Sequence, residues 1–200
     1  MKAFSSFLPL LALFIGGCNS PSSSHPWLLA PSEEDWRVAF SRLAASEQEI
    51  IKIRPLSFTI ALSADSGALC EPKYGPPGGK PIPFERLDMH GICAGFNRAF
   101  ASHEMDRFEI IDAVSFEQIG TPNGLQHHFI ELHWTFRHSS GLIGPISEYA
   151  FGPSVDIKWF PSEVALRAEA NQAVALAFLK VAVDLSRLSE KKKNVPPGEK

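Results

Sequence analysis

The sequence predicts an α+β fold, with a mainly antiparallel sheet of about five strands and two or three helices packed on one face. Two patterns carry this prediction. Between residues 130 and 137, apolar and polar side chains alternate, as in a strand that buries one face. Between residues 163 and 189, apolar side chains recur at helical spacing, which is typical of a long amphipathic helix.

The first predicted elements are a helix and an edge strand. Ser32 precedes three acidic residues, which is the pattern of a capped helix N-terminus, so we expect a helix over about 33–46. Apolar residues then alternate over 51–62, and Pro55 interrupts them. A proline inside such a run indicates a strand near the edge of a sheet.

The middle of the chain predicts a loop, a helix and a hairpin. Residues 63–83 are rich in glycine and proline, and loops of this length tend to be functional or mobile. Apolar residues at helical spacing predict a helix over about 84–105. A strand over 108–116 follows, and Asn123-Gly124 is a turn signal that leads into the strand at 130–137.

The remaining elements complete one domain. We expect strands at 145–151 and 154–160, followed by the long helix to about residue 189. Lysines at 191–193 favour a helix C-terminus, and a disordered tail over 191–200 is expected. The sequence thus predicts a single α+β domain over 32–190.

Composition narrows the possible functions. A formal net charge of −3 supplies no basic field for nucleic acid, and 44% apolar with 20% charged residues describes a globular protein. Fifteen phenylalanines predict either a large aromatic core or an apolar surface that a partner covers.

The N-terminus has the parts of a secretory signal. Lys2 supplies a positive start, residues 4–15 form an apolar run, and Gly16-Gly17 precede Cys18. The run is shorter than the roughly 20 apolar residues that a transmembrane helix needs. Export followed by cleavage is therefore expected, with residues 1–17 as the signal peptide.

Residues Ile15 to Cys18 resemble a lipobox, the processing site of bacterial lipoproteins. The resemblance implies cleavage before Cys18 and fatty acylation (diacylglycerol and a further chain such as palmitate) of that residue. Asn19 follows where inner-membrane lipoproteins often carry Asp, which favours the outer membrane, facing the periplasm. The Ser/Pro-rich stretch 18–31 would be a flexible tether. The alternative is a secreted protein with a chance cysteine after its signal.

Cys70 and Cys93 are the two further cysteines. In an oxidising periplasm two thiols tend to pair, so we expect a Cys70–Cys93 disulfide that staples the 63–83 loop. The alternative is a reactive thiol or a metal ligand, but neither cysteine has a CxxC partner.

The sequence predicts no catalytic residue, metal site or cofactor. His133 and Glu131 are near neighbours on one strand face and could join a second element, but His127 would lie roughly 20 Å from His133. His103 is expected to be a helix-end residue, and the Gly75–Lys80 stretch lacks phosphate-loop spacing. Solvent-facing histidines are the preferred interpretation.

The order of elements resembles small periplasmic α+β lipoproteins that assist outer-membrane assembly or secretion, such as the lipopolysaccharide-assembly, curli-type and Pel-type lipoproteins. That resemblance implies a non-catalytic accessory component of an envelope transport or secretion machine. It would be bound to the membrane by lipid and to an envelope protein partner or to copies of itself, but not to nucleic acid. Two alternatives stay open: a binder of lipid or another amphiphile, with a pocket between sheet and long helix, and an enzyme acting on envelope polymers.

Overall fold

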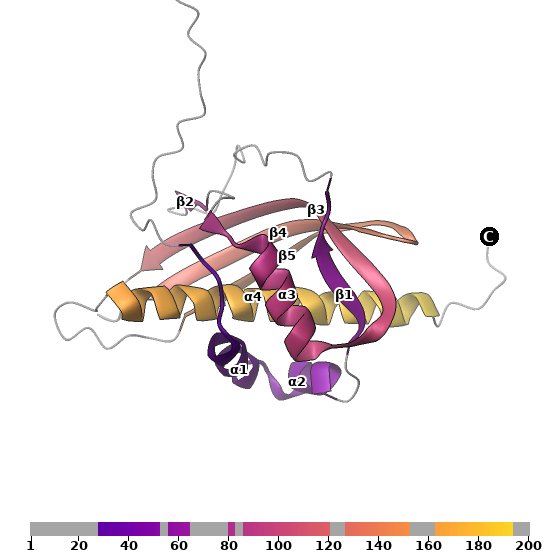
Figure 1. Cartoon of the computed structure of the whole chain (residues 1–200), viewed down its shortest axis with the longest axis horizontal. Helices are drawn as coiled ribbons and strands as arrows, with labels where there is room; N and C mark the ends of the chain where they lie inside the picture. The colour runs from indigo at the N-terminus through magenta and orange to yellow at the C-terminus, as the bar shows by residue number, and fades with distance from the viewer. Residues whose placement is uncertain are drawn as a thin grey trace, which may run out of the picture.

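A computed structural model describes residues 28–52, 56–64, 80–82, 86–120, 127–152 and 163–193. A single sheet forms one layer, and the helices lie on one side of it (Figure 1). The expected strand at 154–160, the tether before residue 28 and the tail after residue 193 lie outside the described residues.

The sheet combines a meander with one parallel strand. The meander consists of β3 (Ala101–Gly120), β4 (His127–His138) and β5 (Gly141–Phe151), which pair antiparallel in that order. On the other side of β3, β1 (Leu56–Leu62) pairs parallel and the two-residue β2 (Lys80–Pro81) pairs antiparallel.

The α+β class is confirmed, but the expected mainly antiparallel sheet of about five strands is wrong in detail. Four long strands form a mixed sheet, because β1 and β3 run in the same direction. A parallel pair needs a long crossover connection, and here that connection contains a helix, α3 (Met89–Phe100).

Two short helices replace the single one expected over 33–46. They are α1 (Glu33–Ser41) and α2 (Ala45–Lys52). The backbone N–H groups of Arg42 and Leu43 bond back to the carbonyls of Ala39 and Phe40, which closes α1. Ile51, expected in a strand, is a buried residue of α2, so the strand β1 starts later than the alternation suggested.

Helix α3 is shorter than the expected 84–105. The Asp88 side chain accepts a hydrogen bond of 2.8 Å from the N–H of Gly91 and so caps its start. At the other end Ala101 pairs with Leu56 of β1, so the backbone leaves the helix for the sheet. His103 therefore belongs to β3, and its expected place at a helix end is wrong.

The alternation predicted for β4 is confirmed, and it defines the face toward the helices. Its residues Ile130, Leu132, Trp134 and Phe136 are each 0% exposed. On β3 a register shift between Ile110 and Asp112 changes which side chains point inward.

The long final helix, α4 (Glu163–Lys193), packs along β4 and β5. Its buried residues include five alanines, which allow the helix axis to approach its neighbours closely. Phe178 of α4 lies edge-on to Trp134 of β4 at 5.3 Å and to Trp36 of α1 at 5.6 Å between ring centroids. Among the described phenylalanines, a large part is thus core: Phe58, Phe96, Phe108, Phe136 and Phe178.

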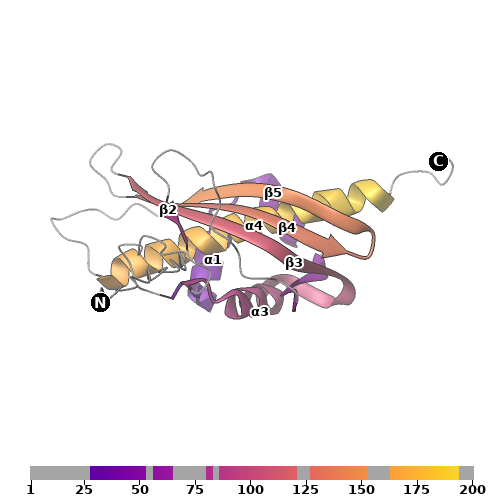
Figure 2. The ribbon, with the colours of Figure 1, turned by 90° about the horizontal axis from the view of Figure 1, so that it is seen from above.

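Helices α1 and α2 form a second layer, packed on α3 and α4 rather than on the sheet. Seen from above, the strands lie in front of α4 (Figure 2). In the described part of the chain, all four helices are therefore on the same side, and the opposite side of β3–β5 has no helix over it.

Candidate functional site

The candidate site is the sheet face that points away from the helices, which we call the outer face. Cross-strand partners share a face, so the register assigns its members. Glu131 lies between Phe116 of β3 and Tyr149 of β5, and the next row contains Val114, His133 and Ser147. Among the described residues of these strands, the outer face includes Asp112, Val114, Phe116, Gln118, Phe129, Glu131, His133, Thr135, Ser147, Tyr149 and Phe151.

A hydrogen-bonded chain of three polar side chains crosses the outer face. His133 Nε2 lies 2.6 Å from Glu131 Oε1, and His133 Nδ1 lies 2.7 Å from Ser147 Oγ. A neutral imidazole that donates from Nε2 to the carboxylate can accept the serine hydroxyl hydrogen at Nδ1. Phe116 meets the His133 ring edge-on at 5.9 Å and helps to fix its orientation.

The connectivity of this chain is that of a serine, a base and an orienting acid, but its setting differs from that of a hydrolase. The Ser147 side chain is exposed in the middle of a strand, paired with His133 across the ladder. Serine nucleophiles usually stand on a sharp turn next to backbone N–H groups that stabilise the oxyanion. As placed here, the three groups satisfy one another's hydrogen bonds.

Three aromatic side chains gather where β4 begins and β5 ends, and we call them the aromatic end. Phe129 lies 5.8 Å from Tyr149 and 5.0 Å from Phe151 between ring centroids. Tyr149 is 53% exposed and Phe151 is 48% exposed. Lys180 of α4 reaches around the sheet edge and places its Nζ 4.9 Å from the centroid of the Tyr149 ring.

A carboxyl pair lies between the edge strand β5 and α4. Burial, most of all, together with the hydrogen bond with Asp184 and the negative charge of Asp184, raises the pKa of Glu148 to about 7. Lys180 opposes this shift of the Glu148 pKa through its positive charge. Glu148 is therefore a group that changes its charge near neutral pH.

Two cavities open among the helices and at the far end of the sheet. One of about 340 Å³ lies between α1 and α3 and is lined by Trp36, Gly95 and Arg98, among others. The other, of about 170 Å³, contains His138, which stacks on Phe108 at 4.5 Å. The second is smaller than the roughly 300 Å³ at which small-molecule sites begin.

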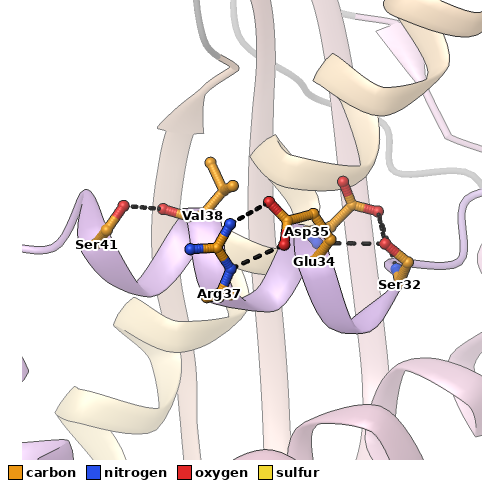
Figure 3. Close-up of polar contacts among 6 residues, drawn as sticks. All are labelled: Ser32, Glu34, Asp35, Arg37, Val38 and Ser41. Carbon is orange, nitrogen blue, oxygen red and sulfur yellow. Dashed lines mark hydrogen bonds and ion pairs between the residues drawn. The ribbon is translucent and has the colours of Figure 1, made fainter.

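The acidic cluster after Ser32 is a helix cap, as the sequence predicts. The Ser32 N–H donates to Asp35 Oδ2 at 2.9 Å, and the Asp35 N–H donates to Ser32 Oγ at 3.2 Å (Figure 3). Glu34 pairs instead with Arg37 in the next turn, with Arg37 Nε donating at 2.8 Å. These carboxylates are engaged locally, which leaves no pair free for acid–base work.

The cysteines predicted to matter fall into two groups. Cys18 and Cys70 lie outside the described residues. Cys93 is a free, buried thiol of α3, and the Cys70–Cys93 disulfide stays a prediction. Burial, with a smaller contribution from Asp88, raises the pKa of Cys93 to about 12, so a nucleophilic thiolate is disfavoured at neutral pH.

The sequence brings Glu131 and His133 together, and the structure adds Ser147, which sequence reasoning missed. The signal was present in the turn at Ser139-Ser140, since folding a hairpin there sets residues near 147 opposite His133. The His127 side chain lies outside the part that the structure describes. Within the described residues, no three His, Cys, Asp or Glu side chains form a group that could hold a metal ion.

The described helices include none with the length and apolar character needed to span a bilayer. Comparisons of the chain with protein families, with curated proteins and with solved structures gave no match.

Proposed function

We propose that this protein is a non-catalytic lipoprotein of the cell envelope, anchored by lipid on Cys18 and accessory to a transport or secretion machine. The single observation that carries the proposal is a sheet whose described helices all lie on one face, preceded by a short Ser/Pro-rich stretch and a lipobox. Such a domain has a broad surface to offer a protein partner while it stays close to the membrane.

The order of elements supports the same proposal. A strand, a crossover helix, a three-strand meander and a long C-terminal helix follow one another as β1, α3, β3–β5 and α4. This order resembles that of the small periplasmic lipoproteins named above, which assist assembly and secretion machines. The support is an analogy of architecture, because folds of one kind serve many functions.

A lipid-binding function is less well supported. It would need a cavity between the sheet and α4, and that interface is filled by close-packed side chains. Those fully buried there include Leu132, Trp134, Ala173, Ala177 and Phe178, each 0% exposed. In the described residues, an acyl chain could enter this layer only by displacing packed core, which costs more than it gains.

One observation favours a second candidate, a hydrolase of envelope esters or amides. The Ser147–His133–Glu131 chain contains a nucleophile, a base and an acid at hydrogen-bond distance. A fluorophosphonate probe on the whole protein decides this candidate. Labelling that Ser147→Ala abolishes would support the hydrolase, and absence of labelling at high probe concentration would reject it.

The accessory function is tested by site-specific photo-crosslinking in intact cells. A photoreactive amino acid at Thr135, on the outer face, should crosslink to a component of a membrane transport or secretion complex. The same group at Arg187, exposed on α4, is the matched control and should not. Equal crosslinking from both positions, together with a monomeric native mass, would contradict the proposal.

A further inference from the structure

The aromatic end is located where the chain arrives from its N-terminus. The Leu29 N–H donates to the Arg86 carbonyl at 2.6 Å, and the Arg86 side chain pairs with Glu117 of β3, also at 2.6 Å. Glu117 is the partner of Ile130 on β4, and Ile130 is the partner of Ala150 on β5. Ala150 lies between Tyr149 and Phe151, so this series of contacts puts the N-terminal segment at the same end of the sheet as the aromatic end, on the helix side of the sheet.

The connection to Cys18 limits how far this end of the sheet can lie from the bilayer. Residues 19–27 separate Cys18 from the first described residue, Leu28. Even fully extended, this stretch reaches no more than about 35 Å. β4 alone has 12 residues, which corresponds to about 40 Å along the strand. A lipid on Cys18 would therefore keep this end of the sheet within about 35 Å of the bilayer, whereas the opposite end lies about 40 Å further along the strands.

The chemistry of the aromatic end suits a bilayer surface. Tyrosine and tryptophan, whose side chains are partly apolar and partly polar, concentrate at membrane interfaces. Lys180 lies next to the Tyr149 ring, where its ammonium can meet a lipid phosphate. Leu28 is 45% exposed at the start of the described chain and adds apolar surface near the same end.

We infer that the aromatic end, formed by Phe129, Tyr149 and Phe151, packs against the phospholipid surface to which Cys18 is anchored. This inference rests on the lipidation of Cys18 in the proposed function. Because the anchor already confines the domain, a small and individually weak contact is enough to set its orientation. The polar part of the outer face, around His133, then stays in solvent for a protein partner.

The edge of β5 argues against a second strand as the occupant. Lys180 Nζ donates to the Tyr149 backbone carbonyl at 2.9 Å, which occupies an acceptor that an added strand would use. Further along, Pro145 lacks an N–H, and the pairing of β5 with β4 shifts register beside it. The aromatic rings can still make contact through their exposed faces.

The experiment uses the lipidated full-length protein in vesicles of phosphatidylethanolamine and phosphatidylglycerol that contain a phospholipid with a photoreactive acyl chain. Labelling is read at Phe129 by mass spectrometry, since the substitutions leave that residue intact. The double variant Tyr149→Ser/Phe151→Ser should lower this labelling at least fivefold. The control Leu142→Ser removes a side chain that is 70% exposed at the other end of β5, about 30 Å away, and should leave it unchanged.

Metabolic labelling with palmitate tests the lipid anchor separately from the docking of the aromatic end. Palmitate uptake with Phe129 labelling that depends on Tyr149 and Phe151 supports the inference. Palmitate uptake with labelling that the double variant does not change, or with labelling spread equally to the Leu142 end, overturns the docking and leaves the anchor intact. Absence of palmitate overturns the proposed function and the docking with it. Circular dichroism of each variant verifies the fold.

Discussion

Trp36 of α1 and Gly95 of α3 form a contact that leaves no room for a side chain at position 95. A Cβ on Gly95 would lie 2.7 Å from Trp36 Nε1 and 3.6 Å from two carbons of the ring. Trp36 is 2% exposed and packs against Phe96 and Phe178, so its ring cannot turn away. Within the described residues, Trp36 Nε1 has no hydrogen-bond partner that would move with it.

We expect Gly95→Ala to destabilise the protein although alanine favours helices. Alanine would usually add about 0.5–1 kcal/mol in a helix interior, but overpacking a core costs roughly 1–3 kcal/mol. Urea unfolding should show a net loss of about 1 kcal/mol. In a Trp36→Phe background, which removes Nε1, the same change should cost less. An equal loss in both backgrounds would show that the contact is not the cause.

Glu148 gives the protein a pH-dependent term in its free energy of unfolding. Its folded pKa of about 7 lies above the ordinary 4.5, so the folded state holds a proton that the unfolded state releases. The stabilisation of the folded state by this proton is complete below about pH 4.5 and is lost as the pH rises through about 7.

The prediction is that Glu148→Gln removes this part of the pH dependence. At pH 8 the variant should be more stable than the parent by about 1 kcal/mol, a value reduced for the partial exposure of the carboxylate. At pH 4 the two should unfold alike. Thermal unfolding across this range measures the difference. Asp112→Asn, an exposed carboxylate of β3, is the control, and an identical profile for both variants would contradict the assignment.

At the scale of elements, a buried ion pair joins the segment before α3 to the sheet. Arg86 and Glu117 have side chains 9% and 4% exposed, and their charged atoms lie 2.6 Å apart. The pair fixes the entry to α3 against β3, next to the backbone bond from Leu29. Removing one partner leaves the other charge buried without a counter-charge, which destabilises the protein more than removing both partners.

Glu117→Ala should therefore cost about 3 kcal/mol in urea unfolding. The double variant Arg86→Met/Glu117→Leu should recover most of that loss. Glu109→Ala is the matched control on the same strand, because Glu109 pairs with the exposed Arg107 and should cost less than about 1 kcal/mol. A double variant as unstable as Glu117→Ala would show that the pair is needed for more than charge balance.

The elements that the sequence predicted well are those with one clear period. β4 alternates without interruption and α4 repeats over many turns, so local pattern and tertiary packing agree. The pattern failed at Ile51, where spacing of two residues suits a strand but the residue belongs to α2. It failed again after Phe100, since pairing with β1 converts residues 101–105 from helix to strand.

Only part of the candidate site could be predicted from the sequence. Glu131 and His133 share a face of one strand, and strand periodicity alone reveals this. Ser147 joins them through pairing between β4 and β5, whose register shifts after Trp134. Such a shift depends on the backbone near Gly144, which has a φ of +117° that glycine adopts easily, and no residue pattern determines it.

At the scale of the whole molecule, the proposed function joins a helix-backed sheet to a membrane through a lipid on Cys18. In the proposed function, a lipid on Cys18 gives one explanation for the helix-free face of the described sheet, the aromatic end and the limited reach from residue 18. Without it, the same surfaces would belong to a freely diffusing protein, and their arrangement relative to a bilayer would have no meaning.

The most direct test is therefore metabolic labelling with palmitate, combined with fractionation of cells that express the full-length protein or its Cys18→Ser variant. The account predicts that the parent protein carries the label and sediments with membranes. It also predicts that the variant takes up no label and is not processed before residue 18. A parent protein that takes up no fatty acid and is recovered in the soluble fraction would contradict the lipid anchor on Cys18, and with it the proposed function.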